Sequence, residues 1–302
     1  MAECGPFGLT SACTKGGHHM RISLILPAKN EAEGLRRALP GVRQLLPDAE
    51  IIVVDDGSTD ATADVARQYG ATVLWSPYSM GNGAAIKRGA RAATGDVLVF
   101  MDADGQHDAQ HVVGLVSKLA EGYDMVVGAR GWDGQASVGR GLANGLYNRV
   151  ASWMTGHKVA DLTSGFRAAN ASKFKEFLHL LPNGFSYPTT ITMAFFRSAY
   201  AVTYLPIPVA DRIGKSHIRP LRDGLRFLLI IFKIATLYSP LKLFAPASAL
   251  FFLLGAGYYC YTFVTENRFT NMSALLISAA VIVFLIGLVS EQITALTYRK
   301  DS

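Results

Sequence analysis

Two long runs without a charged side chain constrain the fold of this chain most. Residues 243–265 and 269–290 contain no Asp, Glu, Lys or Arg. Each exceeds about 20 residues, enough for a helix rising about 1.5 Å per residue to cross a hydrocarbon core of about 30 Å. A pair of buried core helices is the alternative, but core helices seldom extend so far without a charge. We therefore expect a two-helix transmembrane anchor over residues 241–302.

The segment before the first run is amphipathic. Arg219, Arg222, Arg226 and Lys233 are spaced 3, 4 and 7 apart, which puts them on one face of a helix. The other residues of this segment are mostly apolar. This pattern predicts a helix over residues 218–240 that lies in the membrane interface. A third buried helix with a solvated stripe is the alternative.

Charge placement predicts the orientation of the anchor. The positive-inside rule puts the outer flanks of the two runs, and with them the large N-terminal domain, in the cytoplasm. The net charge of +6 favours an anionic partner. With two membrane-length runs present, we expect that partner to be lipid headgroups and not nucleic acid. The flanking basic residues are Arg222, Arg226, Lys233, Lys242, Arg299 and Lys300.

Residues 1–20 have no apolar stretch of the kind a signal peptide needs. We expect a disordered tail or a remnant of an expression vector there. The cysteines Cys4, Cys13 and Cys260 are odd in number and widely spaced. They predict neither a disulfide framework nor a metal site, and they favour a reducing compartment.

Residues 21–217 alternate between short apolar strands and amphipathic helices. Such alternation predicts an α/β fold with a mostly parallel sheet and helices on both faces. Ligands in these folds bind beyond the carboxyl ends of the strands. We expect strands at 22–26, 50–54, 71–75, 96–101 and 124–127, and an edge strand at 200–209. We expect helices at 31–46, 60–69, 82–93, 108–121, 142–154, 172–181 and 189–199.

Polar clusters follow several of these strands. Asp102 and Asp104 come directly after the apolar strand at 96–101, and Gln106 can add a carbonyl oxygen. Two carboxylates at a strand end can bind one Mg²⁺ or Mn²⁺, which prefers oxygen ligands and bridges to substrate phosphates. An acid of the cluster at 53–60 can accept a hydrogen bond from a base or a ribose, or it can simply cap the next helix.

The third strand-end cluster, at 26–31, is by itself only a capped turn. A separate segment with two glycines, at 81–83, precedes a helix and is a candidate to lie near phosphates. Ile86 occupies the last position of what would be a dinucleotide-binding glycine motif. A nicotinamide fold is therefore disfavoured, and the sequence has no P-loop motif.

Five segments occur in order at strand ends: LPAKNE (26–31), VVDDGSTD (53–60), MDADGQHD (101–108), VVGAR (126–130) and LTSGFRA (162–168). Together they resemble the family 2 glycosyltransferases of the GT-A (Rossmann-like) type. More narrowly, they are similar to polyprenyl-phosphate sugar synthases of the dolichol-phosphate mannose synthase group. The similarity spans about residues 21–218. The two C-terminal spans resemble those of bacterial and archaeal members anchored in the plasma membrane, and the Q-x-x-R-W motif of processive polysaccharide synthases is absent.

The resemblance implies a nucleotide-sugar site. Pro27, Lys29 and Glu31 would line the nucleoside, with Lys29 in place of the more usual aromatic residue. Val54 and Asp56 would hold the base. The metal and the donor diphosphate would bind at the loop formed by Asp102, Ala103, Asp104 and Gln106.

The resemblance also implies a set of phosphate-binding cations. Arg130 and Arg140 would meet the acceptor phosphate, with Arg149 as an alternative to Arg140. Arg212 and Lys215 would close over the donor diphosphate from a mobile loop. Asp104, Arg130 and Arg140 would thus carry the catalysis.

The expected activity is an inverting transfer of a hexose, mannose or glucose, from GDP-mannose or a UDP-hexose to a dolichyl- or undecaprenyl-type phosphate, with Mg²⁺ or Mn²⁺ as cofactor. One alternative is a glycosyltransferase with another acceptor, such as a glycan or a diacylglycerol. Another is a membrane protein that binds nucleotide sugars without catalysis, which the intact set of Asp102, Asp104 and Gln106 disfavours. The sequence leaves open the sugar, the polyprenol and the oligomeric state, a homo-oligomer included.

Overall fold

The computed structural model describes residues 14, 15, 18–130, 138–184, 186–208, 229, 232, 236 and 238–298. It divides into two compact units. The first comprises Met1–Arg149 with Lys158–His217, and the second comprises Val150–His157 with Ile218–Ser302. Most of the expected interfacial helix at 218–240 lies outside the described residues.

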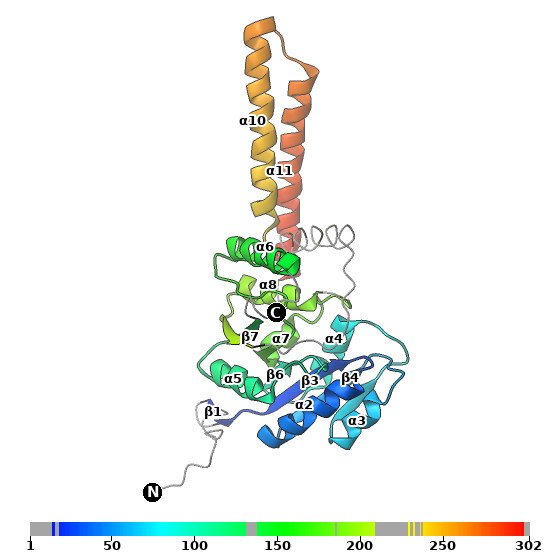
Figure 1. Ribbon diagram of the computed structural model, residues 1–302. Helices are drawn as coiled ribbons and strands as arrows, with labels where there is room; N and C mark the ends of the chain where they lie inside the picture. Colours follow the sequence, from blue (N-terminus) through cyan, green and yellow to red (C-terminus); the bar gives the residue numbers. More distant parts are fainter. Residues whose placement is uncertain are drawn as a thin grey trace. The chain divides into compact units, whose positions relative to one another are not determined.

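A seven-stranded sheet forms the centre of the first unit (Figure 1). Its order is β5-β4-β3-β6-β8-β7-β9, and only β8 is antiparallel to its neighbours. The expected mostly parallel sheet is therefore confirmed, and β9 lies at the edge, in agreement with Pro206 in the strand and Pro208 just after it. The strands are β3 (Ile22–Ala28), β4 (Glu50–Asp55), β5 (Thr72–Trp75), β6 (Val97–Phe100), β7 (Met125–Arg130), β8 (Arg167–Asn170) and β9 (Val202–Ile207).

Helices cover both faces of this sheet. α2 (Ala32–Leu45), α3 (Thr62–Gln68) and α5 (Ala109–Ala120) share one core with the alternate strand residues Leu24, Leu26 and Val53. α4 (Asn82–Ala92) packs on the other face, where Gly89 approaches Ile25. α7 (Ala171–Glu176) and α8 (Tyr187–Arg197) join that second face through Phe174 and Tyr187, whose rings pack at a tilt near Phe100. The continuous apolar strands are explained by burial on both sides.

Three details differ from the sequence-based expectation. β3 continues through Pro27 to Ala28, because Pro27 pairs within the parallel ladder beside Val54. β8 was not expected, since the tetrapeptide RAAN has no β-branched or aromatic residue. Within residues 1–20, where we expected a disordered tail, Thr14–Lys15 (β1) pairs with His18–His19 (β2).

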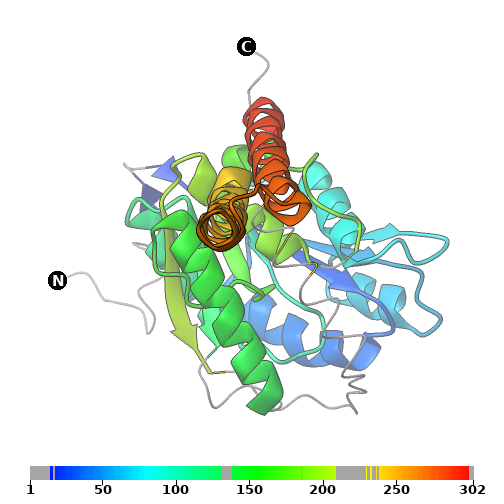
Figure 2. The ribbon, with the colours of Figure 1, turned by 90° about the horizontal axis from the view of Figure 1, so that it is seen from above.

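The second unit contains a hairpin of two 27-residue helices that lie side by side (Figures 1 and 2). They are α10 (Pro240–Glu266) and α11 (Asn271–Thr297). Both are long and apolar enough to cross a membrane, and only 11% and 17% of their most apolar windows are buried. A soluble core helix would be mostly buried, so the large apolar side chains on the outer surfaces favour contact with lipid.

Small residues repeat every seven positions along the inner faces of this hairpin. The buried positions are Ser248, Gly255 and Thr262 on α10, and Ser273, Ala280, Gly287 and Thr294 on α11. Small side chains let two helix backbones approach closely, as in many membrane helix pairs. A Cβ added at Gly255 would come within 2.9 Å of the Leu276 Cβ, and one at Gly287 within 2.7 Å of the Phe244 Cβ. The Ser248 hydroxyl donates to the Ala280 carbonyl at 2.8 Å.

Polar contacts close the end of the hairpin at which α10 begins. A Glu291 carboxylate oxygen of α11 accepts from the Ser239 hydroxyl at 3.0 Å and from the Leu241 N–H at 3.2 Å. Glu291 thereby caps an amide that the helix itself cannot satisfy. Lys242 donates from Nζ to the Met154 carbonyl at 2.8 Å, near the end of α6 (Val138–Thr155).

Candidate active site

Parallel pairing brings the loops that are expected to form the site to the same end of the sheet, beyond the carboxyl ends of the strands. Ala28 at the end of β3 lies in register with Asp55 at the end of β4. Phe100 at the end of β6 pairs with Arg167 at the start of the antiparallel β8. The loops after β3, β4, β6 and β7 therefore meet the loop before β8.

The Asp102–Gln106 loop is fixed tightly against α2. Ala103 is buried, whereas Asp102, Asp104 and Gln106 are partly exposed. Asp104 Oδ1 accepts from the Gln106 N–H at 3.2 Å, and Gly105 turns the chain with a φ of 73°. A Cβ added at Gly34 of α2 would lie 2.1 Å from the Ala103 carbonyl oxygen. The close passage of the helix at Gly34 thus sets the position of both carboxylates.

This loop fits a divalent cation that takes one or two ligands from protein carboxylates and the others from phosphate oxygens and water. Among the described residues, no group of three His, Cys, Asp or Glu side chains is placed to hold a metal. Mg²⁺ and Mn²⁺ commonly bind one or two carboxylates and complete their shell with phosphate oxygens and water. Asp102 and Asp104 supply that number, and Gln106 offers an amide oxygen nearby in the chain.

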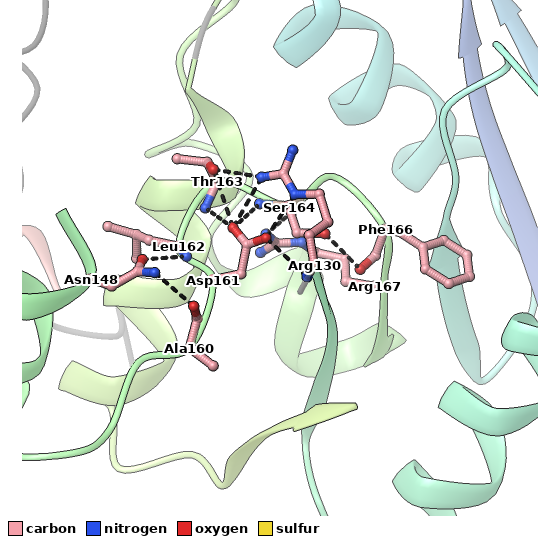
Figure 3. Close-up of polar contacts among 9 residues, drawn as sticks. All are labelled: Arg130, Asn148, Ala160, Asp161, Leu162, Thr163, Ser164, Phe166 and Arg167. Atoms are coloured by element: carbon pink, nitrogen blue, oxygen red, sulfur yellow. Dashed lines mark hydrogen bonds and ion pairs between the residues drawn. The ribbon is translucent and has the colours of Figure 1, made fainter. Parts of the chain in front are cut away.

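Arg130, at the end of β7, forms a two-pronged ion pair with Asp161 (Figure 3). Nε and Nη2 of Arg130 donate to the two carboxylate oxygens at 2.8 and 3.1 Å, and Nη2 also donates to the Thr163 hydroxyl at 2.7 Å. Asp161 further accepts from the Thr163 and Ser164 N–H groups, each at 3.0 Å. The Arg130 side chain remains 31% exposed, against 8% for Asp161.

The electrostatics keep this pair charged. Burial alone would raise the pKa of Asp161, but the hydrogen bonds and charge of Arg130 outweigh it and lower the pKa below its ordinary value. Burial likewise opposes the charge of Arg130, yet its pKa lies above the ordinary value because of Asp161 and, to a lesser extent, Asp102. Asp102 of the carboxylate loop thus helps to stabilise the charge of Arg130.

The buried Arg167 holds the loop that carries Asp161. Arg167 is fully buried, and it donates to the Ser164 and Pro188 carbonyls and to the Thr192 hydroxyl. The Tyr187 hydroxyl donates to the Gly165 carbonyl at 3.0 Å. A Cβ at Gly165 would come within 3.1 Å of Asp102 Oδ2. The loop therefore supports Asp102 on one side and Arg130 on the other.

The part of the site that we expect to bind the nucleoside is built from the loops after β3 and β4, and hydrogen bonds join these two loops. The Asn30 N–H donates to the Ser58 hydroxyl at 2.9 Å, and the Asn30 amide oxygen accepts from the Thr59 N–H at 2.8 Å. Asn30 adopts a φ of 56°, which Asn tolerates better than most residues. These bonds fix the positions of Lys29, which is exposed, and Glu31, which is partly buried.

Two residues expected to hold the base have other contacts. The Asp56 carboxylate accepts from the Ser79 hydroxyl at 2.7 Å and from the Met80 and Gly81 N–H groups at 2.7 and 2.9 Å. These bonds hold its pKa below the ordinary value although burial opposes them. The Val54 side chain is buried and packs close to Gly89 of α4. Their contact with a base remains a prediction.

The glycines of segment 81–83 pack closely against another segment of the chain. A Cβ at Gly83 would lie 2.0 Å from the Pro182 carbonyl oxygen, and the Ala84 N–H donates to the Asn183 carbonyl at 2.9 Å. Segment 182–184 thus covers the start of α4. The glycines are needed for this close packing, and their proximity to phosphates stays a prediction.

The remaining expected cations are only partly described. Arg140 lies in α6, and the position of its side chain lies outside what the structure describes. Arg212 and Lys215 also lie outside the described residues. Conversely, sequence reasoning missed Asp161. The signal was present, because a lone acid followed by Thr163 and Ser164 in an apolar segment is typical of a turn whose carboxylate binds backbone N–H groups.

His107 follows the carboxylate loop and packs inward. Its ring stacks on Phe166 with centroids 4.4 Å apart, and burial lowers its pKa to about 4. The imidazole is therefore neutral near pH 7 and acts as part of the packing between this loop and β8.

Comparisons with known proteins agree with this geometry. Residues 23–178 match the Glycosyl transferase family 2, and residues 239–296 match the GtrB C-terminal hairpin. The chain is 26% identical to the glycosyltransferase AglJ of Haloferax volcanii, over 91% of this chain and 94% of that protein. It is 30% identical to the undecaprenyl-phosphate mannosyltransferase of Micrococcus luteus, over 65% of this chain and 87% of that protein.

A further relative and a solved structure extend the comparison. The undecaprenyl-phosphate 4-deoxy-4-formamido-L-arabinose transferase of Enterobacter sp. is 30% identical over 78% of this chain and 73% of its own. Glucosyl-3-phosphoglycerate synthase from Mycobacterium tuberculosis, crystallised with Mn²⁺ and UDP-glucose, superposes with a TM-score of 0.61. That match covers 77% of this chain and 84% of the other at 21% identity, and it shows a shared fold. Since the family match covers about half of the chain, including every strand from β3 to β8, the protein belongs to glycosyl transferase family 2.

Proposed function

We propose that the protein transfers a hexose from a nucleotide sugar to a polyprenyl phosphate at the cytoplasmic face of a membrane. The observation that carries the proposal is the Arg130–Asp161 pair beside the Asp102–Gln106 loop, in a chain that also holds an apolar helical hairpin. A phosphate donor and a phosphate acceptor need such a cation next to a metal-binding loop. Relatives named as undecaprenyl-phosphate transferases, and one dolichyl-phosphate hexose transferase of Haloferax volcanii, support this acceptor class.

The acceptor requires no general base. A phosphate monoester is largely dianionic above its second pKa of about 6, so its oxygen can attack the anomeric carbon directly. The C–O bond to the acceptor forms as the bond to the nucleoside diphosphate breaks, and the sugar is inverted. The protein must hold two anionic groups close together during this step. Arg130 is suited to the acceptor phosphate because its guanidinium is already oriented by Asp161.

A divalent cation, Mg²⁺ or Mn²⁺, bound at Asp102 and Asp104 would offset the charge of the departing diphosphate. Glucosyl-3-phosphoglycerate synthase, which shares this fold, was crystallised in complex with Mn²⁺, and this supports a metal cofactor here. Arg140, Arg212 and Lys215 are the further cations that we assign to the phosphates. GDP-mannose and UDP-glucose are the first donors to test.

One experiment tests the function. The full chain in vesicles with polyprenyl phosphate is incubated with labelled GDP-mannose or UDP-hexose, and the lipid is extracted. We expect label in a lipid that mild acid hydrolyses. Label in an acid-stable lipid or in a glycan would indicate another acceptor, and no transfer from any donor would indicate a binding protein only.

A matched pair of measurements tests the metal assignment. Asp104→Asn removes one anionic oxygen, so we expect it to abolish turnover without changing the melting temperature. EDTA should inactivate the wild type, and added Mn²⁺ or Mg²⁺ should restore it. Full turnover in EDTA would overturn the metal assignment.

A further inference from the structure

The loop after β5, residues 76–81, carries apolar side chains on its surface, and we call it the β5 loop. Tyr78 and Met80 are 67% and 39% exposed, and Trp75 at the end of β5 is 55% exposed. In the described part of the first unit, Leu146 is the only other large apolar side chain that is exposed. Exposed apolar side chains that gather in one place often mark a binding site.

Strand register places the β5 loop beside the expected nucleoside site. Asp55 at the end of β4 pairs with Ala28 of β3 on one side and with Trp75 of β5 on the other. Lys29 and Asp56 come directly after this row, in the two loops that we expect to hold the nucleoside. The β5 loop leaves the sheet from the same row and therefore lies next to them.

Hydrogen bonds fix the β5 loop against Asp56. The Asp56 carboxylate accepts three of them, all from residues 79–81. Gly57, the next residue in the chain, has a φ of 75°, and a Cβ there would lie 2.9 Å from the carbonyl carbon of Tyr78. The backbone of Tyr78 is thus held beside Asp56, while its ring stays mostly exposed.

The bonds that Asp56 already accepts limit the bases that it can bind. Each carboxylate oxygen accepts about two hydrogen bonds. Oδ2 of Asp56 accepts two, from the Ser79 hydroxyl and the Gly81 N–H, whereas Oδ1 accepts one, from the Met80 N–H. Among the contacts of the described residues, one acceptor position of Asp56 is therefore left, and it lies on Oδ1.

This single position fits uracil and does not fit guanine. Guanine presents N1–H and N2–H side by side, a pair of donors that needs both oxygens of one carboxylate. Uracil presents one donor, N3–H, which lies between two carbonyl groups.

Lys29 can donate to one of those carbonyl groups. Its side chain is exposed, and its ammonium group has three donors. Burial raises the pKa of Asp56, but the hydrogen bonds of the β5 loop and then the charge of Lys29 lower it below the ordinary value. The ammonium group therefore acts on Asp56 from nearby, where it can meet a carbonyl group of the same base.

We propose that the donor is a uridine diphosphate sugar whose uracil donates N3–H to Asp56 Oδ1, accepts from Lys29 Nζ and stacks on the ring of Tyr78. Tyr78 then supplies the aromatic surface that Lys29 lacks, at a position where family 2 glycosyltransferases more usually have an aromatic residue. Stacking on Tyr78 adds affinity for any base, whereas Asp56 and Lys29 select uracil. The inference rests on the proposed function, because it concerns the base of the same nucleotide sugar.

Binding of nucleotides without sugar or acceptor tests the proposal. The full chain in detergent with Mn²⁺ is titrated by calorimetry with UDP, GDP, N3-methyl-UDP and inorganic pyrophosphate. We expect UDP to bind at least tenfold more tightly than GDP. N3-methyl-UDP should bind at least tenfold more weakly than UDP, because its methyl group removes the donor to Asp56 and leaves the protein unchanged. Pyrophosphate has no base and reports on the diphosphate site alone.

Matched variants test the two exposed side chains. Tyr78→Ala should weaken UDP binding about tenfold, whereas Tyr78→Phe keeps the ring and should bind UDP like the wild type. Lys29→Met should weaken UDP binding and narrow the preference for UDP over GDP, whereas Lys29→Arg keeps a charged donor and should narrow it less. The affinity for pyrophosphate and the melting temperature should change little in the Tyr78 variants.

Several results would overturn the proposal. If GDP or N3-methyl-UDP bound as tightly as UDP, the choice of uracil would be wrong and the proposed function would stand. Equal affinity of Tyr78→Ala and the wild type for UDP would exclude the stacking. If neither UDP nor GDP bound, the nucleotide-sugar site itself would be wrong, and the proposed function would fail with the inference. Sugar transfer to polyprenyl phosphate tests the acceptor separately.

Discussion

A single methyl group at Gly34 should disturb the carboxylate loop. In Gly34→Ala the new Cβ would lie 2.1 Å from the Ala103 carbonyl oxygen, so the loop or α2 must move. Displacing a site by about 1 Å can cost about a hundredfold in rate, and we expect a loss of that order in turnover. Gly41→Ala on the same helix is the control, because its Cβ would meet only the Ala109 Cβ at 3.5 Å. Equal rates for the two variants would show that Gly34 does not position the loop.

The Arg130–Asp161 pair should also contribute to stability, with a defined pH dependence. Asp161 has a lowered pKa in the folded protein, so its contribution is present above the unfolded value of about 4 and is lost as pH falls through the folded value. We expect Asp161→Asn to lower the free energy of unfolding by about 2 kcal/mol at pH 7, because a largely buried charge loses its partner. Thermal unfolding of variant and wild type should converge in acid. An equal deficit at pH 7 and at pH 3 would contradict this assignment.

At the scale of elements, the stripe of small residues should hold the hairpin together. Gly255→Leu or Gly287→Leu would push the two backbones apart, since even a Cβ at these positions comes within 3 Å of the facing helix. We expect either variant to lower the melting temperature of the full chain in detergent. Gly257→Leu is the matched control on α10, where an added Cβ has no neighbour within 4 Å. Unchanged melting in all three variants would mean that the helices do not depend on close approach.

Element identity was largely predictable from the sequence. The strands and helices predicted over residues 21–130 match β3 to β7 and the helices between them. They were predictable because the sheet is covered on both faces, which gives apolar strands and amphipathic helices. β8 was missed because its residues RAAN are held by pairing on both sides and not by local preference.

The site was predictable where function depends on neighbours in the chain and less so where it depends on contacts at long range. Asp102 and Asp104 lie two residues apart at a strand end, so their proximity could be read directly. The partner of Arg130 lies 31 residues away, and nothing in the spacing indicates it. Gly34 was missed for the same reason, because its importance comes from a loop that returns to α2 after three strands.

For the whole molecule, the pH profile of turnover should follow the substrate and not the fold. If the acceptor phosphate attacks unaided, the rate should fall below about pH 6 as the phosphate gains a proton. The Arg130–Asp161 pair keeps its charge well below that pH, so the loss should be reversible and should occur without unfolding. Rates at saturating donor between pH 5 and 8, with circular dichroism at each pH, would check this. A profile that is flat down to pH 5 would point to a different nucleophile.

The cap at Glu291 has a consequence for how the membrane part is made. The Leu241 amide at the start of α10 finds its acceptor 50 residues later in the chain. Until the ribosome has synthesised α11 and that helix has turned back, the first turn of α10 lacks this acceptor. The hairpin is therefore completed only when its second helix is in place, and a chain interrupted between the two helices would carry an uncapped helix start at the edge of the hydrocarbon layer.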